Sequence, residues 1–231
     1  MSAQLPLALR YSPDQRFETF VGAPAGSIAS LQALAACPSA DWLYIAGPDG
    51  VGKTHLALAT CAAAEQADRR AAYLPLLAAA GRLREALEAL EGNDLIVLDG
   101  IEAIAGNRED EIALFEFHNR ARAAGMNVLY VADAMPDGLQ LVLPDLRSRL
   151  SQCVRIALTS LDDEGRHELL RLRAQRRGLA LDEAALDWLL KRVDRDLGSL
   201  TALLDKLDRE SLAAQRRVTV PFLRQILGTE P

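Results

Sequence analysis

The sequence predicts an α/β fold, in which a parallel five-stranded sheet with flanking helices is followed by a small all-helical domain. Five short apolar runs alternate with longer helical patterns between residues 42 and 158, and the strand-like runs stop after Leu158. Aromatic residues make up only 5% of the chain, while alanine and leucine dominate, so helices should outnumber strands.

The predicted strands are short, apolar and followed by turn or helix signals, which is typical of strands buried on both faces of a parallel sheet. In chain order they cover residues 42–46, 71–74, 95–98, 128–132 and 154–157. Helical patterns such as 55–67 and 111–124 lie between them. This alternation favours a doubly wound domain.

The helical part is expected to begin near residue 160. Ser160 followed by Asp163 resembles a helix-start capping arrangement, and Gly178 should end that helix after a basic last turn. Further helices are expected over 182–193, over 199–215 and, after a brief extended piece, from Pro221 onward.

Three parts of the chain follow from this division. They are an N-terminal tail over residues 1–15, an α/β domain over 16–159 and a helical domain over 160–231.

Composition excludes several classes of protein. The 231 residues are 50% hydrophobic and 25% charged, which rules out wholesale disorder. The sequence has no apolar run near the ~20 residues of a membrane helix and no secretory signal, so we expect a cytoplasmic protein without a membrane partner. The net charge of −6 argues against non-specific duplex binding. For the arginine cluster over 166–177, the pattern favours a solvated helix face over contacts with DNA or a partner.

A phosphate-binding loop is the strongest signal in the chain. The residues Gly47, Pro48, Asp49, Gly50, Val51, Gly52, Lys53 and Thr54 satisfy the Gly-x-x-x-x-Gly-Lys-Thr pattern between a predicted strand and a predicted helix. The glycines let backbone N–H groups wrap a phosphate, and the helix N-terminus adds positive partial charge. Lys53 should reach the β- and γ-phosphates, and Thr54 should supply a Mg²⁺ ligand. ADP or ATP is the expected ligand, and a glycine-rich turn without a ligand is the alternative.

Such a loop also needs an acid at the end of a neighbouring strand to hold the Mg²⁺ shell. Asp99 ends one of the predicted strands and meets this need. The alternative is that Asp99 only opens a turn with Gly100. Hydrolysis further requires a group that positions water, yet Gly100 follows Asp99 directly and Glu102 is the nearest carboxylate. We therefore expect weak or no intrinsic ATPase activity.

Together these motifs resemble an AAA+ P-loop NTPase, and most closely the family of the bacterial replication initiator DnaA. The segment over residues 17–22 resembles the part of the initiator that lies beside the adenine, which implies nucleotide contacts from Phe20 and Val21. The loop with its following His55 resembles the initiator's phosphate loop. The chain ends at Pro231, so we expect no initiator-type DNA-binding domain, and the resemblance is closest to the DnaA-related regulatory inactivators (Hda).

The resemblance to these inactivators implies a negative regulator of chromosomal replication initiation. Such a protein docks on the DNA-loaded sliding clamp, the β subunit of the replicative polymerase, and triggers hydrolysis of the ATP bound to the initiator DnaA. The residues that match the clamp-binding motif are Gln4, Leu5, Leu7 and Leu9. Neighbouring positions depart from that motif, whose usual terminal aromatic is missing, and a disordered tail is the alternative.

The resemblance also assigns residues to the hydrolysis chemistry. Arg149 resembles the arginine finger that inserts beside the γ-phosphate of the neighbouring initiator, and a surface or interdomain salt bridge is its alternative. Asp133 falls where the family has its sensor-1 residue, or else it is a turn acid. An ungapped reading puts Gly198 where the family has its sensor-2 arginine. Arg195, about one helical turn earlier, could substitute if its side chain faces the pocket.

Two functions compete for this sequence. The first is the regulator, which would contact DNA only indirectly or weakly, associate with the nucleoid through the clamp, and leave homodimer formation open. The second is a stand-alone AAA+ ATPase of the helicase-loader type, which would hydrolyse ATP without the initiator. Gly100 and Gly198 count against the second, so the sequence favours the regulator.

Overall fold

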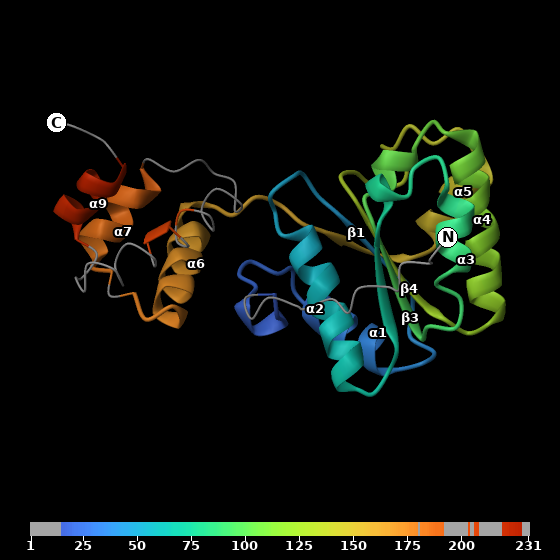
Figure 1. The fold of residues 1–231 in the computed structure, drawn as a ribbon, viewed down its shortest axis with the longest axis horizontal. Helices are drawn as coiled ribbons and strands as arrows, with labels where there is room; N and C mark the ends of the chain where they lie inside the picture. Colours follow the sequence, from blue (N-terminus) through green and yellow to red (C-terminus); the bar gives the residue numbers. More distant parts are fainter. Residues whose placement is uncertain (1–14, 180, 192–202, 204–205, 208–218, 228–231) are drawn as a thin grey trace, which may run out of the picture.

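The computed structural model describes residues 15–179, 181–191, 203, 206–207 and 219–227. Over these residues an α/β domain is followed by a helical domain, as predicted (Figure 1). The α/β domain contains, in chain order, η1 (Phe17–Thr19), α1 (Ser27–Ala36), β1 (Leu43–Ala46), α2 (Lys53–Gln66), β2 (Ala71–Pro75), η2 (Leu76–Ala78), α3 (Leu83–Glu88), β3 (Leu95–Asp99), η3 (Ile101–Ile104), α4 (Arg108–Ala123), β4 (Asn127–Ala132), α5 (Pro144–Ser151) and β5 (Val154–Ala157). The helical domain contains α6 (Asp163–Arg176), α7 (Glu183–Leu190) and α9 (Val220–Leu227).

The five strands form one parallel sheet in the order β2-β3-β4-β1-β5. All five predicted strands are confirmed to within one residue at each end. Ala46 pairs in register with Ala132 on one side and with Ala157 on the other, and Asp99 pairs with Val131. The carboxyl ends of β1, β3 and β4 therefore meet at one edge of the sheet, where open α/β sheets bind their ligands.

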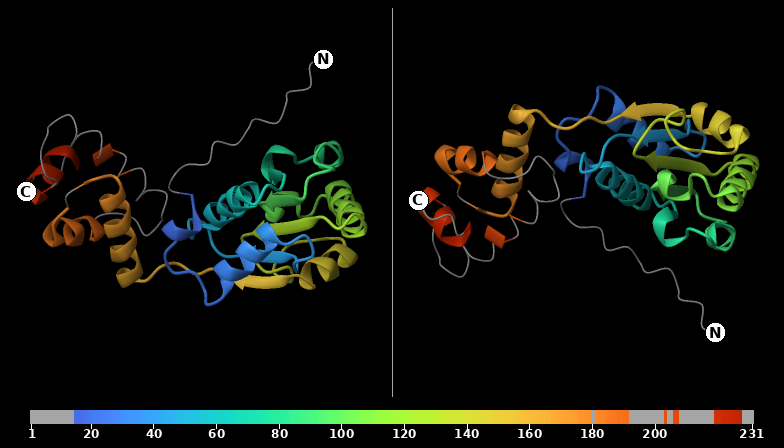
Figure 2. Two further views of the ribbon diagram at one scale, coloured as in Figure 1. Left: turned by 90° about the horizontal axis from the view of Figure 1, so that it is seen from below. Right: turned by 90° about the horizontal axis from the view of Figure 1, so that it is seen from above.

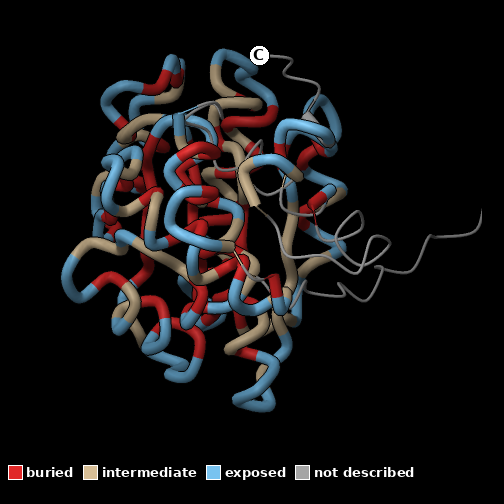
Figure 3. The backbone as a smooth tube through the Cα atoms, turned by 90° about the vertical axis from the view of Figure 1, so that its left-hand side faces the viewer, coloured by how far each residue is buried: buried red, intermediate tan, exposed pale blue. Residues whose placement is uncertain are grey.

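Alternate residues of the inner strands face two separate apolar cores. Tyr44 of β1 and Tyr130 of β4 pack with α3, α4 and α5 on one face. Ile45 and Val131, their neighbours in sequence, pack with α1 and α2 on the opposite face. Figure 2 shows these helices on the two sides of the sheet, and Figure 3 shows the buried positions gathered between the layers. Helices α2 and α5 thus lie on opposite faces.

The prediction that every strand is buried on both faces is wrong for the two edge strands. Residues of β2 are half-buried or exposed, and in β5 only Ile156 is buried. Both strands have a neighbour on one side only, because β2 and β5 are the ends of the sheet. The inner strands β1, β3 and β4 are buried as predicted, apart from the half-buried Asp99 at the end of β3.

In the helical domain, the predicted cap of the first helix is corrected by two residues. The N-cap is Asp162 and not Ser160. Oδ1 of Asp162 accepts a hydrogen bond from the Gly165 N–H at 2.8 Å. Gly178 follows the helix with a φ of +68°, as the stop signal requires. Leucines of α6, α7 and α9 share a third core, which Leu207 joins. Most of the helix predicted over 199–215 lies outside the described residues.

The arginine cluster over 166–177 is only partly a solvated face. Arg166 and Arg173 are 4% and 8% exposed and lie on the same side of α6, seven residues apart. Arg171 is exposed and pairs with Glu168, with Nε to Oε2 at 3.0 Å. The prediction of a solvated face therefore fails for Arg166 and Arg173. No helix in the described part of the chain combines the length and hydropathy of a membrane span.

Candidate functional site

The phosphate loop lies between the end of β1 and the start of α2. Gly50 and Gly52 have φ values of +75° and +95°, which favour glycine. A Cβ on Gly47 would lie 2.6 Å from the Leu158 carbonyl oxygen, and one on Gly52 would lie 2.7 Å from Cε2 of Phe20. Glycine at these places is therefore required by close packing as well as by conformation. The loop and the first turn of α2 leave backbone N–H groups facing the carboxyl edge of the sheet.

Lys53 places its ammonium group inside this loop. Its Nζ donates hydrogen bonds to the carbonyl oxygens of Gly47 at 2.7 Å and Pro48 at 3.0 Å. Lys53 is only 9% exposed. Its third partner is the Asp49 carboxylate, whose Oδ1 lies 3.4 Å from Nζ and whose side chain is almost wholly exposed. The loop thus holds one buried positive charge beside its own backbone, which suits an anionic ligand.

Thr54 and Asp99 come together although 45 residues separate them. The Thr54 hydroxyl donates to Oδ2 of Asp99 at 2.7 Å, and the Tyr73 hydroxyl donates to the same oxygen at 2.7 Å. Burial, and then the neighbouring Asp99 carboxylate, raise the pKa of Tyr73 above its ordinary value, so this hydroxyl stays protonated and can donate. The hydroxyl and the carboxylate are hard oxygen donors of the kind that Mg²⁺ prefers.

Glu102 connects η3 to the end of β4. Its Oε2 accepts a hydrogen bond from the backbone N–H of Asp133 at 3.0 Å. Asp133 is exposed just beyond β4, next to the carboxyl end of β3. The structure therefore places Glu102 and Asp133 at the same sheet edge as Asp99, with one oxygen of Glu102 already bonded to the backbone.

The segment around Phe20 lies against the phosphate loop and the helical domain. Phe20 contacts the His55 ring edge-on, with ring centroids 5.3 Å apart. His55 turns toward the N-terminal segment, where its Nε2 lies 2.8 Å from the Arg16 carbonyl oxygen. Val21 packs on the apolar core of the helical domain. Phe20, Val21 and His55 thus join the loop to the helical domain.

Arg149 lies on the other side of the sheet from the helix that follows the phosphate loop. It is exposed on α5, which packs on the face of the sheet opposite α2. Among the residues that the structure describes, no acidic side chain forms an ion pair with Arg149. Its guanidinium group is thus available to another molecule. The predicted residues Arg195, Gln4, Leu5, Leu7 and Leu9 lie outside the described residues.

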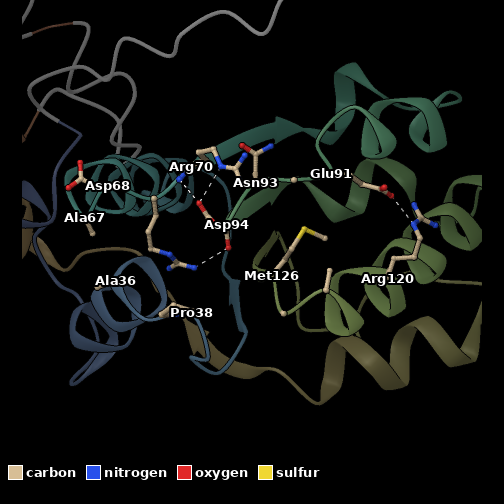
Figure 4. Close-up of a pocket in the computed structure, with 14 residues that line it drawn as sticks. Ala36, Pro38, Ala67, Asp68, Arg70, Glu91, Asn93, Asp94, Arg120 and Met126 are labelled. Carbon is tan, nitrogen blue, oxygen red and sulfur yellow. Dashed lines mark hydrogen bonds and ion pairs between the residues drawn. The ribbon is translucent and has the colours of Figure 1, made fainter.

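A cavity of about 710 Å³ opens at the opposite, amino-terminal edge of the strands (Figure 4). Its arginines are already engaged. Arg70 pairs with Asp94 at 3.6 Å and Arg120 pairs with Glu91 at 2.8 Å, while Arg69 donates to three backbone carbonyls. The predicted phosphate-loop residues do not line this cavity, and its charges neutralise one another.

Sequence reasoning missed the role of Tyr73 and of two buried acids, Asp110 and Glu111. Tyr73 reaches Asp99 because β2 lies beside β3, and the sequence does not reveal strand order. Glu111 is 0% exposed in α4. The sequence does contain a signal for the burial of Glu111, because this residue precedes Leu114 by three positions and therefore lies on the same apolar face of the helix.

Two family models match the chain in succession. The model described as the bacterial DnaA ATPase domain matches residues 11–157, which is more than half of the chain. The chain belongs to the family of bacterial DnaA ATPase domains. The model described as the Hda lid domain matches residues 163–227. The DnaA-like domain is therefore followed by an Hda-type lid, and the predicted AAA+ fold is confirmed.

Solved structures of DnaA show the same fold. Domain III of the Thermotoga maritima replication initiation protein DnaA has a TM-score of 0.79 at 24% identity, covering 95% of this chain and 98% of that chain. AMPPCP-bound DnaA from Aquifex aeolicus has a TM-score of 0.71 at 22% identity, covering 84% and 65%. The Thermotoga maritima RuvB Holliday junction branch migration motor has a TM-score of 0.69 at 20% identity, covering 93% and 71%.

Proposed function

We propose that this DnaA-like chain is a negative regulator of replication initiation, which binds the DNA-loaded sliding clamp and stimulates hydrolysis of the ATP held by the initiator DnaA. The observation that carries this proposal is the exposed, unpaired Arg149 on a DnaA-like domain that bears an Hda-type lid. A guanidinium group that has no acidic partner in the described chain, and lies on the face opposite α2, suits action on a neighbouring molecule's nucleotide.

The chain itself holds ADP or ATP with Mg²⁺ in this proposal. The residues fit both groups, because the loop contains a buried ammonium and tightly packed glycines, and because Thr54 and Asp99 bring two oxygen donors together. Mg²⁺ would neutralise phosphate charge there. Phe20 and Val21 would flank the base, and Arg195 would reach the nucleotide from the lid. A DnaA relative binds AMPPCP, which supports the same ligand class here.

Hydrolysis of the chain's own nucleotide is expected to be slow. Glu102 is the nearest carboxylate after Asp99, and one of its oxygens already accepts the Asp133 N–H. A carboxylate held in this way is less free to accept a proton from water. We assign Asp133 the sensor-1 position, where it would contact nucleotide at the sheet edge.

The N-terminal motif supplies the tether to the clamp. Gln4 would provide a polar anchor, and three leucines, Leu5, Leu7 and Leu9, would fill apolar pockets of an extended-peptide groove. Tethering raises the local concentration of the finger around initiator molecules near the clamp. It also accounts for a role on DNA despite the net charge of −6, because contact with DNA is indirect.

The test is phosphate release from ATP-loaded DnaA in the presence of clamp-loaded DNA. Addition of the full chain should accelerate release, and a chain without residues 1–10 should act only at much higher concentration. A full chain that leaves the initiator's hydrolysis unchanged would refute the proposal. If that chain instead hydrolyses ATP rapidly without DnaA, it is a stand-alone ATPase of the helicase-loader type.

A further inference from the structure

The carboxylate of Glu111 is fully buried and bonded to three backbone N–H groups. Oε1 accepts from Gly106 at 2.8 Å and from Val142 at 3.0 Å, and Oε2 accepts from Leu143 at 2.7 Å. The residue is 0% exposed. A carboxylate that accepts three backbone hydrogen bonds holds those donors in fixed positions.

Two of these donors lie at the start of α5, the helix that carries Arg149. Leu143 is the N-cap residue of α5 and has no side-chain capping bond, and Pro144 follows it. The Leu143 N–H is one of the groups that a helix start leaves unsatisfied, and a side chain usually caps such ends locally. Here Glu111 supplies the acceptor from a different helix. The Arg147 guanidinium donates to the Leu141 carbonyl, which ties α5 to the same loop.

Apolar packing on one face supplies most of the other contacts of this helix. It has eight residues, and Leu146 and Leu150 are its buried side chains. Two buried side chains alone leave a short helix free to rock, whereas directional hydrogen bonds at its N-cap residue limit that motion. Arg149 follows Leu143 by six residues, or about 9 Å along the helix axis, so a tilt at the start displaces the guanidinium group.

We propose that Glu111 is a positioning residue for Arg149, because its buried carboxylate fixes the start of α5 and thereby aims the arginine finger. This inference rests on the proposed function. It adds a requirement that a merely structural buried acid would not have: loss of the Glu111 bonds must lower the rate at which a bound initiator hydrolyses ATP, beyond any loss of stability.

The neighbouring Asp110 provides a matched control. It is 3% exposed, and its carboxylate accepts from the backbone N–H groups of Gly81 at 2.7 Å and Leu83 at 3.3 Å. Leu83 is the first residue of α3. Both acids therefore brace the start of a helix that packs on α4, but only Glu111 braces the helix with the finger.

The experiment compares Glu111→Gln with Asp110→Asn at equal concentrations of folded protein. Each change replaces one acceptor oxygen by an NH₂ group that faces backbone donors, so both variants should unfold at a lower temperature than wild type. At saturating regulator, Glu111→Gln should lower the maximal rate of ATP hydrolysis by DnaA on the order of 10- to 100-fold, because small misplacements of a catalytic group are costly. Its half-saturating concentration should change little. Asp110→Asn should keep the wild-type maximal rate.

Hydrogen exchange of the peptide over residues 139–151 provides the structural readout, and it should become faster in Glu111→Gln alone. If wild type stimulates DnaA but Glu111→Gln and Asp110→Asn give the same maximal rate, the positioning role is wrong and the proposed function stands. If wild type itself does not stimulate DnaA, the proposed function fails, and the positioning role fails with it. Should Glu111→Gln not fold, Glu111→Asp takes its place. That variant keeps the charge with a shorter reach, and a wild-type maximal rate would overturn the proposal.

Discussion

Lowering the pH from 7 to 5 should cost the protein about 2 kcal/mol of unfolding free energy through the single side chain of His118. This histidine is 2% exposed on α4, and its Nδ1 lies 3.0 Å from the Tyr130 hydroxyl. Burial, and to a smaller extent the positive charges of Arg122 and Arg149, together lower the pKa of His118 from 6.5 to about 4. The folded protein therefore disfavours the protonated ring.

The sign and size follow from the two pKa values. In the unfolded chain His118 takes up a proton below about pH 6.5, but in the folded chain only below about 4. Its contribution to stability is present above pH 6.5 and is lost as the pH falls toward 4. The full difference of about 2.5 pH units corresponds to about 3.4 kcal/mol, of which about 2 kcal/mol lies between pH 7 and 5. The expected drop in melting temperature is about 4–8 °C.

Urea unfolding followed by far-ultraviolet circular dichroism at pH 7 and pH 5 measures this loss. His118→Asn is the comparison, because its amide does not titrate and can still pair with Tyr130. The variant should lose about 2 kcal/mol less than wild type over the same range. At pH 5 a carboxyl whose pKa is lowered, such as Asp94, still contributes fully, since that stability is lost only below about pH 4. Equal losses in both proteins, or a His118 pKa near 6.5 in an NMR titration, would refute the reasoning.

Three further variants test the proposed binding sites and the packing of the phosphate loop. Lys53→Ala should weaken nucleotide binding at least tenfold in calorimetry, because it removes the buried ammonium group. Unchanged affinity would show that the loop is not the nucleotide site. Gly52→Ala adds a Cβ at a φ of +95° and 2.7 Å from Phe20, so it should lower the unfolding free energy by roughly 1–3 kcal/mol in urea titrations; a wild-type midpoint would contradict the close packing. Leu7→Ala should loosen clamp binding by about tenfold in surface plasmon resonance through the loss of one buried side chain, and equal affinities would exclude the motif.

The fold could be predicted because its signals are local. An apolar run followed by Gly47 and the rest of the phosphate loop identifies β1 and α2 without any knowledge of distant contacts. The burial of β2 and β5 was overestimated, because only the strand order shows that they are edges. The sequence alone does not locate the cap of α6, because serine and aspartate both cap helices; in the structure the cap is Asp162, three residues before Gly165, and not the expected Ser160.

The site was predictable only where sequence spacing defines it. Lys53 and Thr54 follow from the loop pattern, and Asp99 was chosen because an acid that ends an apolar strand reaches the sheet edge. Tyr73 and Glu111 were not predicted, because each acts on a residue at least 26 positions away, through strand order or helix packing. Such contacts depend on tertiary structure, which local periodicity does not encode.

The central claim is that Arg149 acts on the initiator's nucleotide, and the maximal rate of ATP hydrolysis by DnaA at saturating regulator tests it most directly. Arg70→Ala is the control, because it removes an exposed guanidinium group at the amino-terminal ends of the strands, outside the proposed nucleotide site. Wild type and Arg70→Ala should both accelerate hydrolysis, whereas Arg149→Ala should leave it near the unstimulated rate while its own nucleotide affinity is unchanged. Full stimulation by Arg149→Ala would contradict the account.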